Sequence, residues 1–532
     1  MSTSLEGQGF GRWRARLWPV HGYELKKLIP MILLFFFILF NYTILRDTKD
    51  TLVVTAAKGS QIIPFLKFWG VMPGALIVMF IYSELSNKLS KPALFYSSIA
   101  PFIVFFGLFG WVLYPYRGAL SPTDFCAWLS RILPAGFRGL IDVIELWPFS
   151  LYYVFSELWG SVGISLVYWG FANDNTSVSE SKRFYPIFTL FANISLIFSG
   201  KFIQWASVVR THISSSDPWQ TSLHYMMSTV IVSGILILGV YWWINRYVLT
   251  DERFYNPVTQ ARAKKEKPKL SMKESFLFLI RSKYLGCIAI LVMGYGISIN
   301  LVEVTWKHLL HLQYPSYNDY SAFMGKFSET TGIITIVVTF FLSGSAIRKM
   351  GWKRTAVITP VILLVTGVFF FSFTIFRGEL VVVIARLGTH PLFLAVIFGA
   401  IQNIASKAAK YAFFDPTKEM AYIPLDQELK IKGKAAVDVV AARLGKSGGS
   451  LIQQGLLIAL VSVSAIIPYV AGILFFIIFV WIWAVCALSR QFSRLTKKRK
   501  EEEEEEERRS RRGLDDGCLS TSADPQGGSS SS

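Results

Sequence analysis

The chain has 532 residues, of which 52% are hydrophobic and only 17% are charged. A soluble protein of this size carries roughly a quarter charged residues, so the composition excludes an ordinary soluble domain. The net charge of +19 does not indicate nucleic-acid binding, because the basic residues lie between apolar blocks and at the chain ends. The four cysteines have neither paired nor metal-ligand spacing, which excludes a disulfide framework and a zinc site.

Apolar blocks predict an all-α membrane protein with about twelve transmembrane helices. Met31–Phe40 and Ile473–Val485 leave no polar face, and a helix needs roughly 20 such residues to cross the hydrocarbon core. Helices are expected because every backbone polar group must be satisfied within the segment. The predicted span cores are Leu28–Leu45, Ile62–Ser83, Ala93–Leu113, Trp147–Ala172, Phe184–Trp205, His224–Ile244, Tyr284–Trp306, Phe323–Ile347, Ala356–Phe376, Leu392–Phe414, Ala435–Val461 and Ile466–Leu488.

The positions of lysine and arginine predict that both chain ends are cytoplasmic. The N-terminus, the long loop after the sixth span and the short connections after the second, fourth, eighth and tenth spans are basic, as cytoplasmic loops are. The expected parts are a cytoplasmic N-terminal segment (1–24), a six-helix half (25–247), a basic cytoplasmic loop (248–282), a second six-helix half (283–490) and a disordered, charged cytoplasmic tail (491–532).

A weak internal repeat relates the two predicted halves. The turn at Leu85–Leu94 matches Leu342–Lys353 in place and charge, and Ser199–Gln204 (SGKFIQ) is echoed by Gly448–Gln453 (GGSLIQ). Parallel six-helix halves with a site between them at mid-membrane are typical of major-facilitator-like secondary transporters. The repeat therefore favours that architecture.

Ionisable residues inside spans are costly and mark candidate sites. The first candidate segment is Arg46–Asp50, directly after the first apolar run. If the helix continues, Tyr42, Arg46 and Lys49 share one face, where two cations would suit a polyanion. A loop in which the neighbouring opposite charges neutralise each other is an equal alternative.

Glu157 lies in the middle of the fourth predicted span and shares a helix face with Tyr153. It is expected to be a carboxylate in a central cavity, where it accepts hydrogen bonds from a substrate or balances a cation. A structural ion pair with Arg46 or Lys49 is compatible with that role.

The seventh span carries a second carboxylate. Asn300, Glu303 and Lys307 recur at i, i+3 and i+7. Lys307 could extend to the membrane interface, the ordinary behaviour of a lysine near a helix end. Glu303 lies deeper and is the stronger candidate.

In the eleventh span, Lys446 is expected to be buried among small residues, and Gly445 and Gly449 would let another helix approach closely. Gly445-Lys446-Ser447 resembles the end of a phosphate-binding P-loop, but Val440 stands where that motif needs glycine and no strand precedes it. A P-loop ATPase is excluded. A lysine still attracts phosphate as a point charge without that loop.

Cations on the first and eleventh spans predict a multiply anionic substrate. At an effective dielectric constant near 20, one charge pair at about 4 Å contributes about 4 kcal/mol. Several cations could compensate the dehydration of a triphosphate, with no metal and no cofactor required. The two carboxylates would neutralise the site between loads, which favours exchange over net leak.

Four segments resemble the bacterial and plastid ATP/ADP translocase family: Asn41–Trp69, Ser156–Asn173, Lys182–Phe188 and the span around Lys446. The similarity covers nearly all of Leu28–Arg490 and looks closest to the chlamydial and rickettsial carriers. The resemblance implies import of host ATP across the inner membrane in exchange for ADP and phosphate. It implies no hydrolysis, so the chain is expected not to be an enzyme. The expected partners are these substrates and lipid, without nucleic acid, and the protein is expected to be a monomer.

The resemblance also implies which residues form the site. By motif position the charged intramembrane residues of the family fall on Lys49, Glu157, Glu303 and Lys446, with Arg46 and Arg443 as helpers. The phosphate-binding set is then Arg46, Lys49, Arg443 and Lys446. The set that binds substrate or balances charge is Tyr153, Glu157, Asn193 and Glu303. Tyr153 and Asn193 join it from their positions in the fourth and fifth predicted spans rather than from the resemblance. Asn193 is a candidate for adenine recognition, and Tyr153 or Trp159 could stack on the base.

Three other functions remain as alternatives. A proton-coupled importer of nucleotides would use Glu157 or Glu303 as its proton site. A membrane enzyme such as a lipid transferase would need an acidic or histidine-containing cluster, which the six histidines do not form with carboxylates. A channel would not show flux that saturates at carrier rates.

Overall fold

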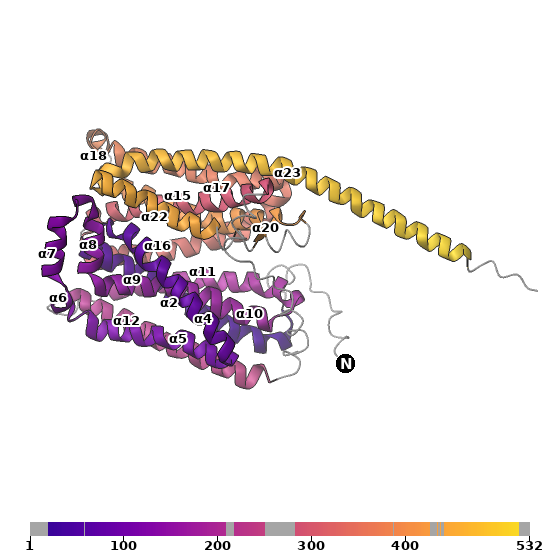
Figure 1. Ribbon diagram of the computed structural model, residues 1–532, viewed down its shortest axis with the longest axis horizontal. Coiled ribbons are helices and arrows are strands. Elements are labelled where there is room, and N and C mark those ends of the chain that lie inside the picture. Colours follow the sequence, from indigo (N-terminus) through magenta and orange to yellow (C-terminus); the bar gives the residue numbers. More distant parts are fainter. Residues whose placement is uncertain are drawn as a thin grey trace, which may run out of the picture.

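The computed structural model describes residues 20–57, 59–208, 217–250, 282–386, 388–425, 433–434, 437 and 441–520. Within these ranges the chain is helical and contains no strand. Figure 1 shows long helices that run roughly parallel between two faces. We call the face with the N-terminus and the outward extension of α23 the terminal face, and the opposite face, with α6, α7, α8 and α18, the loop face.

The N-terminal half is built around α2, which packs against α9, α11 and α12. A π-helical segment, Leu66–Val71, joins α3 to α4, and another, Gly160–Tyr168, joins α9 to α10. The helices of this half are α2 (Leu25–Ala56), α3 (Ile62–Phe65), α4 (Met72–Lys88), α5 (Lys91–Leu108), α6 (Arg117–Leu120), α7 (Thr123–Ile132), α8 (Arg138–Glu145), α9 (Trp147–Trp159), α10 (Trp169–Asn175), α11 (Val178–Val208) and α12 (Pro218–Trp243).

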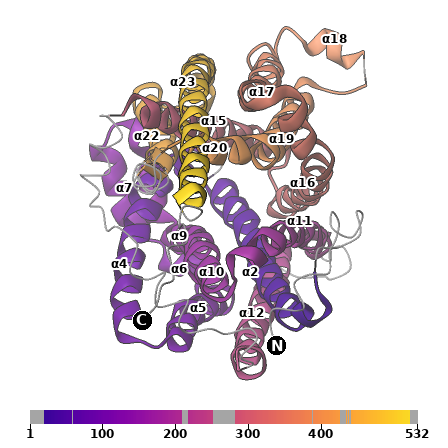
Figure 2. The ribbon, with the colours of Figure 1, turned by 90° about the vertical axis from the view of Figure 1, so that its right-hand side faces the viewer.

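In the C-terminal half α15 has the corresponding central place, and it packs against α19, α22 and α23. A π-helical segment, Lys410–Phe414, joins α19 to α20. The helices are α15 (Lys283–Gln313), α16 (Tyr317–Val338), α17 (Gly344–Ile375), α18 (Val381–Ala385), α19 (Pro391–Ala409), α20 (Asp415–Ala421), α22 (Ala442–Leu460) and α23 (Val463–Ser520). Viewed along the helices, the two halves separate by colour into two bundles that meet at α2, α11, α15 and α16 (Figure 2).

Polar side chains set the first turns of several of these helices. Ser90, Asp217, Ser282 and Ser316 each accept a hydrogen bond from the backbone N–H three residues further on. These residues begin α5, α12, α15 and α16, and they satisfy amide groups that have no partner within the helix. Short polar residues between the apolar blocks therefore position the ends of the spans.

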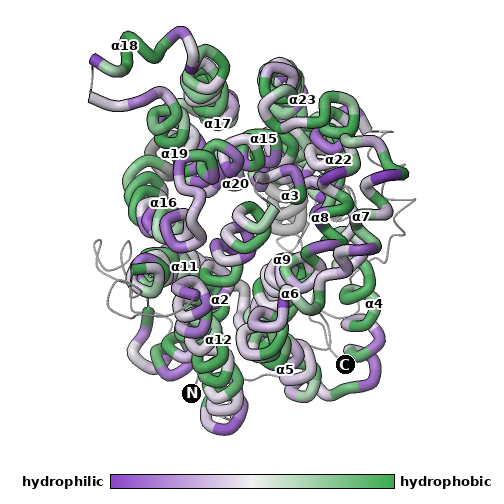
Figure 3. Tube along the Cα trace, turned by 90° about the vertical axis from the view of Figure 1, so that its left-hand side faces the viewer, coloured by the Kyte–Doolittle hydropathy of each residue, from purple (hydrophilic) through white to green (hydrophobic). Residues whose placement is uncertain are grey.

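Ten described helical stretches are long and apolar enough to cross a membrane, which confirms the membrane-protein class. Large apolar side chains such as Phe80, Phe341 and Phe476 are more than 60% exposed, as expected for contact with lipid. In Figure 3 the long helices are mostly coloured as hydrophobic, with hydrophilic stretches on α2 and α20.

The predicted number of twelve spans is not confirmed. The predicted span Trp147–Ala172 is helical, as is the described part of Ala435–Val461 up to Leu460, but neither is among the ten apolar stretches. The first carries Glu157 and the second Lys446. The polar and small residues of these two spans lower their mean hydropathy. Such residues are expected in helices that pack against other helices and not against lipid alone.

The C-terminal segment differs from its prediction. Residues 491–520, expected to be a disordered tail, continue α23, whereas 521–532 lie outside the described residues. Lysine, arginine and glutamate are strong helix formers, and Lys497 lies 3.7 Å from Glu501 one turn further on. Nearly all of the predicted basic loop 248–282 also lies outside the described residues.

Candidate substrate site

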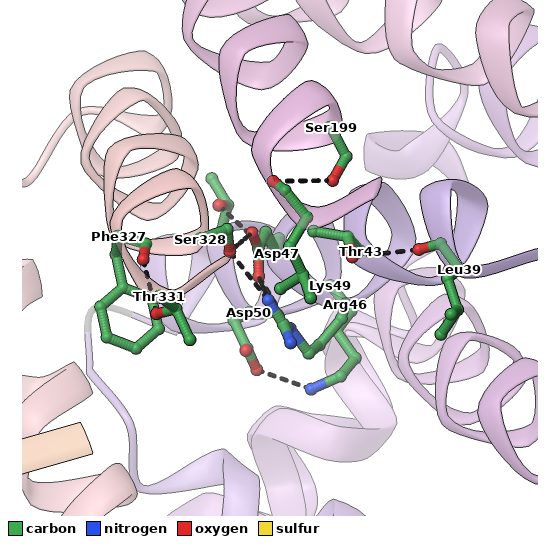
Figure 4. A network of polar contacts seen from close by, with 12 residues as sticks. Leu39, Thr43, Arg46, Asp47, Lys49, Asp50, Ser199, Phe327, Ser328 and Thr331 are labelled. Atoms are coloured by element: carbon green, nitrogen blue, oxygen red, sulfur yellow. Dashed lines mark hydrogen bonds and ion pairs between the residues drawn. The ribbon is translucent and has the colours of Figure 1, made fainter. Parts of the chain in front are cut away.

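The charged segment after the first apolar run is helical. It belongs to α2, and both expected local pairs form within it. Arg46 Nη2 lies 2.9 Å from Asp47 Oδ1, and Lys49 Nζ lies 2.8 Å from Asp50 Oδ1 (Figure 4). The alternative of a loop is therefore wrong, although the neutralisation of neighbouring charges that it included is present within the helix.

Lys49 also connects α2 to α9. Its ammonium lies 3.1 Å from Glu157 Oε1 and 3.9 Å from the centre of the Tyr153 ring. Lys49 is 2% exposed and Tyr153 is fully buried, while Glu157 keeps 27% of its side-chain surface exposed. Of the predicted site residues, the structure thus brings Lys49, Tyr153 and Glu157 into direct contact.

A second group of charges lies on α15. Glu303 Oε1 is 2.7 Å from Lys307 Nζ, and Glu303 Oε2 is 3.3 Å from Lys67 Nζ. The prediction that Lys307 extends to the membrane interface is wrong, because its side chain is 1% exposed and points at two carboxylates. An unpaired ammonium at this depth would be too costly, so the lysine turns inward to its partners.

Ion pairs and hydrogen bonds join the two groups across the halves. Lys307 Nζ lies 2.7 Å from Asp50 Oδ2, and Lys67 Nζ donates to Asn300 Oδ1 at 2.7 Å. Ser328 of α16 accepts a hydrogen bond from Arg46 and donates one to Asp47 (Figure 4). We call the set the central polar cluster; it comprises Arg46, Asp47, Lys49, Asp50, Lys67, Tyr153, Glu157, Asn300, Glu303, Lys307 and Ser328.

Lys446 lies beside this cluster rather than within its ion pairs. Its backbone carbonyl accepts a hydrogen bond from Asn300 Nδ2 at 2.6 Å. The prediction that Lys446 is buried is wrong, because its side chain is exposed. It interacts electrostatically with Glu157, yet among the described residues no carboxylate lies at ion-pair distance from it. The close helix approach predicted here is confirmed, since a Cβ on Gly445 would lie 3.1 Å from Met293 Cα.

Two predicted site residues lie away from the cluster. Arg443 is exposed, and its Nη2 contacts Met79 Sδ at 3.4 Å. Asn193 Nδ2 donates to Thr189 O at 2.9 Å. The backbone carbonyl of Asn193 lies next to Gly332 in the contact between α11 and α16. Their roles in binding substrate remain predictions.

Sequence reasoning missed three charged residues that the structure places at or next to the cluster. Local spacing predicts Asp50 only as the charge-neutralising partner of Lys49, although it also pairs with Lys307. The predicted site contains neither Lys67 nor Lys407, although both lie inside predicted spans. Their position in an apolar stretch was a usable signal, because charged residues within spans are rare and functional.

The donor set of the cluster suits an anion better than a metal ion. Among the described residues, no group of three or more His, Cys, Asp or Glu side chains could hold a metal. Each cluster carboxylate except Asp47 instead faces at least one lysine ammonium. Ammonium and guanidinium groups from both halves are the ligands that proteins use for phosphate.

Sequence comparison agrees with this chemistry. The profile of the TLC ATP/ADP transporter family matches residues 3–492. The chain belongs to this family. It is similar to ADP,ATP carrier protein 1 of Chlamydia muridarum, with 55% identity over 492 residues that cover 92% of this chain and 93% of the relative. It is also similar to the chloroplastic ADP,ATP carrier protein 1 of Arabidopsis thaliana, with 50% identity over 90% of this chain and 76% of the relative.

Solved structures support the architecture of this TLC family member. A D-xylose-proton symporter superimposes with a TM-score of 0.54 at 13% sequence identity, covering 87% of this chain and 97% of the symporter. At that identity the likeness shows the fold alone, which is the predicted major-facilitator-like fold. Together with the family membership it identifies a multi-pass membrane transporter, not an enzyme.

Proposed function

We propose that the protein exchanges ATP for ADP across a membrane by alternating access, with the central polar cluster and Lys446 binding the phosphates. The observation that carries the proposal is the cluster itself, in which cations of both halves meet deep inside the chain. The names of the similar carriers supply the substrate pair. A site shared between two bundles is what alternating access requires.

Charge balance supports exchange rather than net uptake. Four cations of the cluster are matched by four carboxylates; these are Arg46, Lys49, Lys67 and Lys307 against Asp47, Asp50, Glu157 and Glu303. Two of the pairs, Lys307 with Asp50 and Lys67 with Glu303, tie one half to the other. An empty carrier must break these buried pairs before it reorients, whereas bound phosphates compete for the same ammonium groups and lower that cost.

Contacts near the loop face support a closed side there. Ser60 Oγ donates to Val304 O at 2.8 Å, and Asn318 Nδ2 donates to Ser207 O at 2.9 Å. A Cβ on Gly136 would lie 2.2 Å from Ile458 O, so the halves touch at this position as well. We infer that substrate reaches the cluster from the terminal face in this conformation.

The remaining details are part of the same proposal. The terminal face is cytoplasmic, so both chain ends lie inside the cell, and the protein is a monomer in the inner membrane of a bacterium. Phosphate leaves together with ADP when ATP enters. The basic loops of the sequence and the resemblance to carriers of intracellular bacteria support this arrangement.

The geometry gives less support to a proton-coupled importer. That mechanism needs a carboxyl group that is free to take up a proton. Glu157 is bonded to Lys49, and Glu303 is bonded to both Lys67 and Lys307. A proton would have to displace one of these ammonium groups, so charge balancing is the role that the contacts favour.

Uptake of labelled ATP into proteoliposomes tests the function. An exchanger fills ADP-loaded vesicles much faster than empty ones, and unlabelled ADP and ATP compete better than other nucleotides. A pH step across empty vesicles should have no effect. Equal uptake into loaded and empty vesicles, or uptake driven by the pH step, would contradict exchange.

A further inference from the structure

Lys407 is a cation of the interior that the described ion pairs leave free. It lies on α19, half-buried, with its ammonium 4.7 Å from the centre of the Phe327 ring. It interacts electrostatically with Arg46, Asp47 and Glu303, which places it beside the central polar cluster. Among the described residues no carboxylate lies at ion-pair distance from it.

A half-buried ammonium held only by an aromatic ring is incompletely compensated. The attraction between a cation and a ring is weaker than the stabilisation that a desolvated ammonium needs. An anion that entered the cluster would supply the missing charge. Lys407 is therefore placed to bind a substrate phosphate opposite the cations of the N-terminal half.

Tyr411 follows Lys407 by one helical turn, toward the terminal face. It lies in the π-helical segment that continues α19, and its side chain is 44% exposed. The Lys410 ammonium lies 4.5 Å from the centre of the Tyr411 ring, and nearly half of the side chain remains exposed.

The same order of residues occurs on the facing helix. On α2, Tyr42 lies one turn before Arg46, also toward the terminal face, and the Arg46 guanidinium is 5.9 Å from the Tyr42 ring. Gly160 supports this ring from behind, since a Cβ there would lie 2.6 Å from Tyr42 Cε2. Tyr42 and Tyr411 lie within electrostatic range of each other, as do Arg46 and Lys407, and α16 packs against both α2 and α19, so both pairs border the same region between the halves.

We propose that α19 and its continuation form the second wall of the nucleotide site, in which Lys407 binds the phosphates and Tyr411 stacks on the base opposite Tyr42. The site then has two levels, a phosphate level at Lys407 and a base level at Tyr411. These levels match a nucleotide, which is anionic at one end and flat and aromatic at the other. The base then lies toward the terminal face and the phosphates toward the cluster. The assignment rests on the proposed function for the identity of the substrate.

The aromatic residues suggested by the sequence are not free for this role. Tyr153 is fully buried beneath the Lys49 ammonium. Trp159 is fully buried as well, and its indole N–H donates to Ile38 O at 3.0 Å. Stacking on a base needs an open ring face, which Tyr411 offers and these two residues do not.

Ligand-induced stabilisation of the purified full-length protein in detergent tests both levels without transport. Thermal midpoints titrated with ATP and with inorganic tripolyphosphate, which lacks a base, give the two apparent dissociation constants. Lys407→Gln should weaken both ligands by about tenfold or more, because a charge-assisted bond contributes roughly 1.5–3 kcal/mol. Tyr411→Ala should weaken ATP by about tenfold and leave tripolyphosphate unchanged.

Matched variants separate binding from folding. Lys407→Arg and Tyr411→Phe should restore most of the affinity, and Lys201→Gln, an exposed lysine of α11, should change neither ligand. Unchanged tripolyphosphate affinity in Lys407→Gln would overturn the phosphate level, and equal loss of both ligands in Tyr411→Ala would overturn the base level. If the wild type binds ATP but fails to exchange it in vesicles, the proposed function fails while the site assignment stands.

Discussion

Lys307 is the side chain on which charge compensation in the central polar cluster most depends. It is 1% exposed and bonds to Asp50 on α2 and to Glu303 on its own helix, both at 2.7 Å. Asp50 is itself 1% exposed, so it has no solvent to replace a lost partner. Removing one member of a buried pair is more damaging than removing both, because the remaining charge is left uncompensated.

Lys307→Met should therefore destabilise the protein strongly, by about 3–5 kcal/mol. Adding Asp50→Asn to Lys307→Met should restore much of the lost stability, because no buried charge is then left without a partner. Lys49 still pairs with Glu157, and Glu303 still pairs with Lys67. Thermal midpoints of the two single variants and the double variant in detergent complete the cycle. A double variant no more stable than Lys307→Met alone would show that the two charges do not compensate each other.

The sequence predicts single residues of the site better than their partners. Lys49, Glu157 and Glu303 stand out because a charge in an apolar run needs an explanation. The contacts of Asp50 with Lys307 and of Lys67 with Glu303 join residues more than two hundred positions apart. Local spacing carries no information on such pairs, since they depend on how the two halves pack.

At the scale of elements, α11 and α16 make the most extensive contact between the described parts of the two halves. A Cβ on Gly200 would lie 2.5 Å from Gly325 O, and a Cβ on Gly325 would lie 2.7 Å from Gly200 O. A further glycine, Gly332, would meet Asn193 O at 2.8 Å. Glycines let these backbones touch, as small residues do in other membrane helix pairs.

Gly325→Ala should lower the thermal midpoint and slow exchange, because the added methyl group meets backbone atoms that cannot move aside. Gly455→Ala on α22 is a matched control, since no atom lies within 4 Å of its added Cβ. In a helix interior, alanine is more favourable than glycine by about 1 kcal/mol, so the control should be at least as stable as the wild type. Equal midpoints and exchange rates for the two variants would contradict the tight contact.

The sequence also predicts most elements, since ten predicted spans coincide with apolar helices. It does not predict the π-helical segments, such as Leu66–Val71, which aims Lys67 at Asn300. Nor does it predict that α23 continues through residues 491–520. Charge density suggests disorder there, yet the same residues are good helix formers with a span to extend from.

For the whole molecule, the paired charges of the cluster sum to zero, and the substrate supplies the charge that crosses the membrane. ATP carries one more negative charge than ADP. Moving one charge through 100 mV changes the free energy by about 2.3 kcal/mol. Exchange of ATP for ADP alone therefore depends on the membrane potential.

An inside-negative potential, set with potassium and valinomycin, should slow ATP uptake into vesicles loaded with ADP alone. If phosphate leaves with ADP, as proposed, phosphate inside should remove the slowing, because a phosphate monoanion carries the missing charge. ADP exchanged for ADP should ignore the potential and serves as the control. Slowing that persists with phosphate present would show that phosphate does not accompany ADP.

The length of α23 links events inside the bilayer to the solution beside it. At about 1.5 Å per residue, its 58 residues span about 87 Å, while the hydrocarbon core is only about 30 Å thick. One continuous helix therefore serves as a wall of the C-terminal half and as a rod that projects from the terminal face (Figure 1). A small tilt of that half therefore displaces the distal end of α23 by many ångströms relative to the membrane-embedded body.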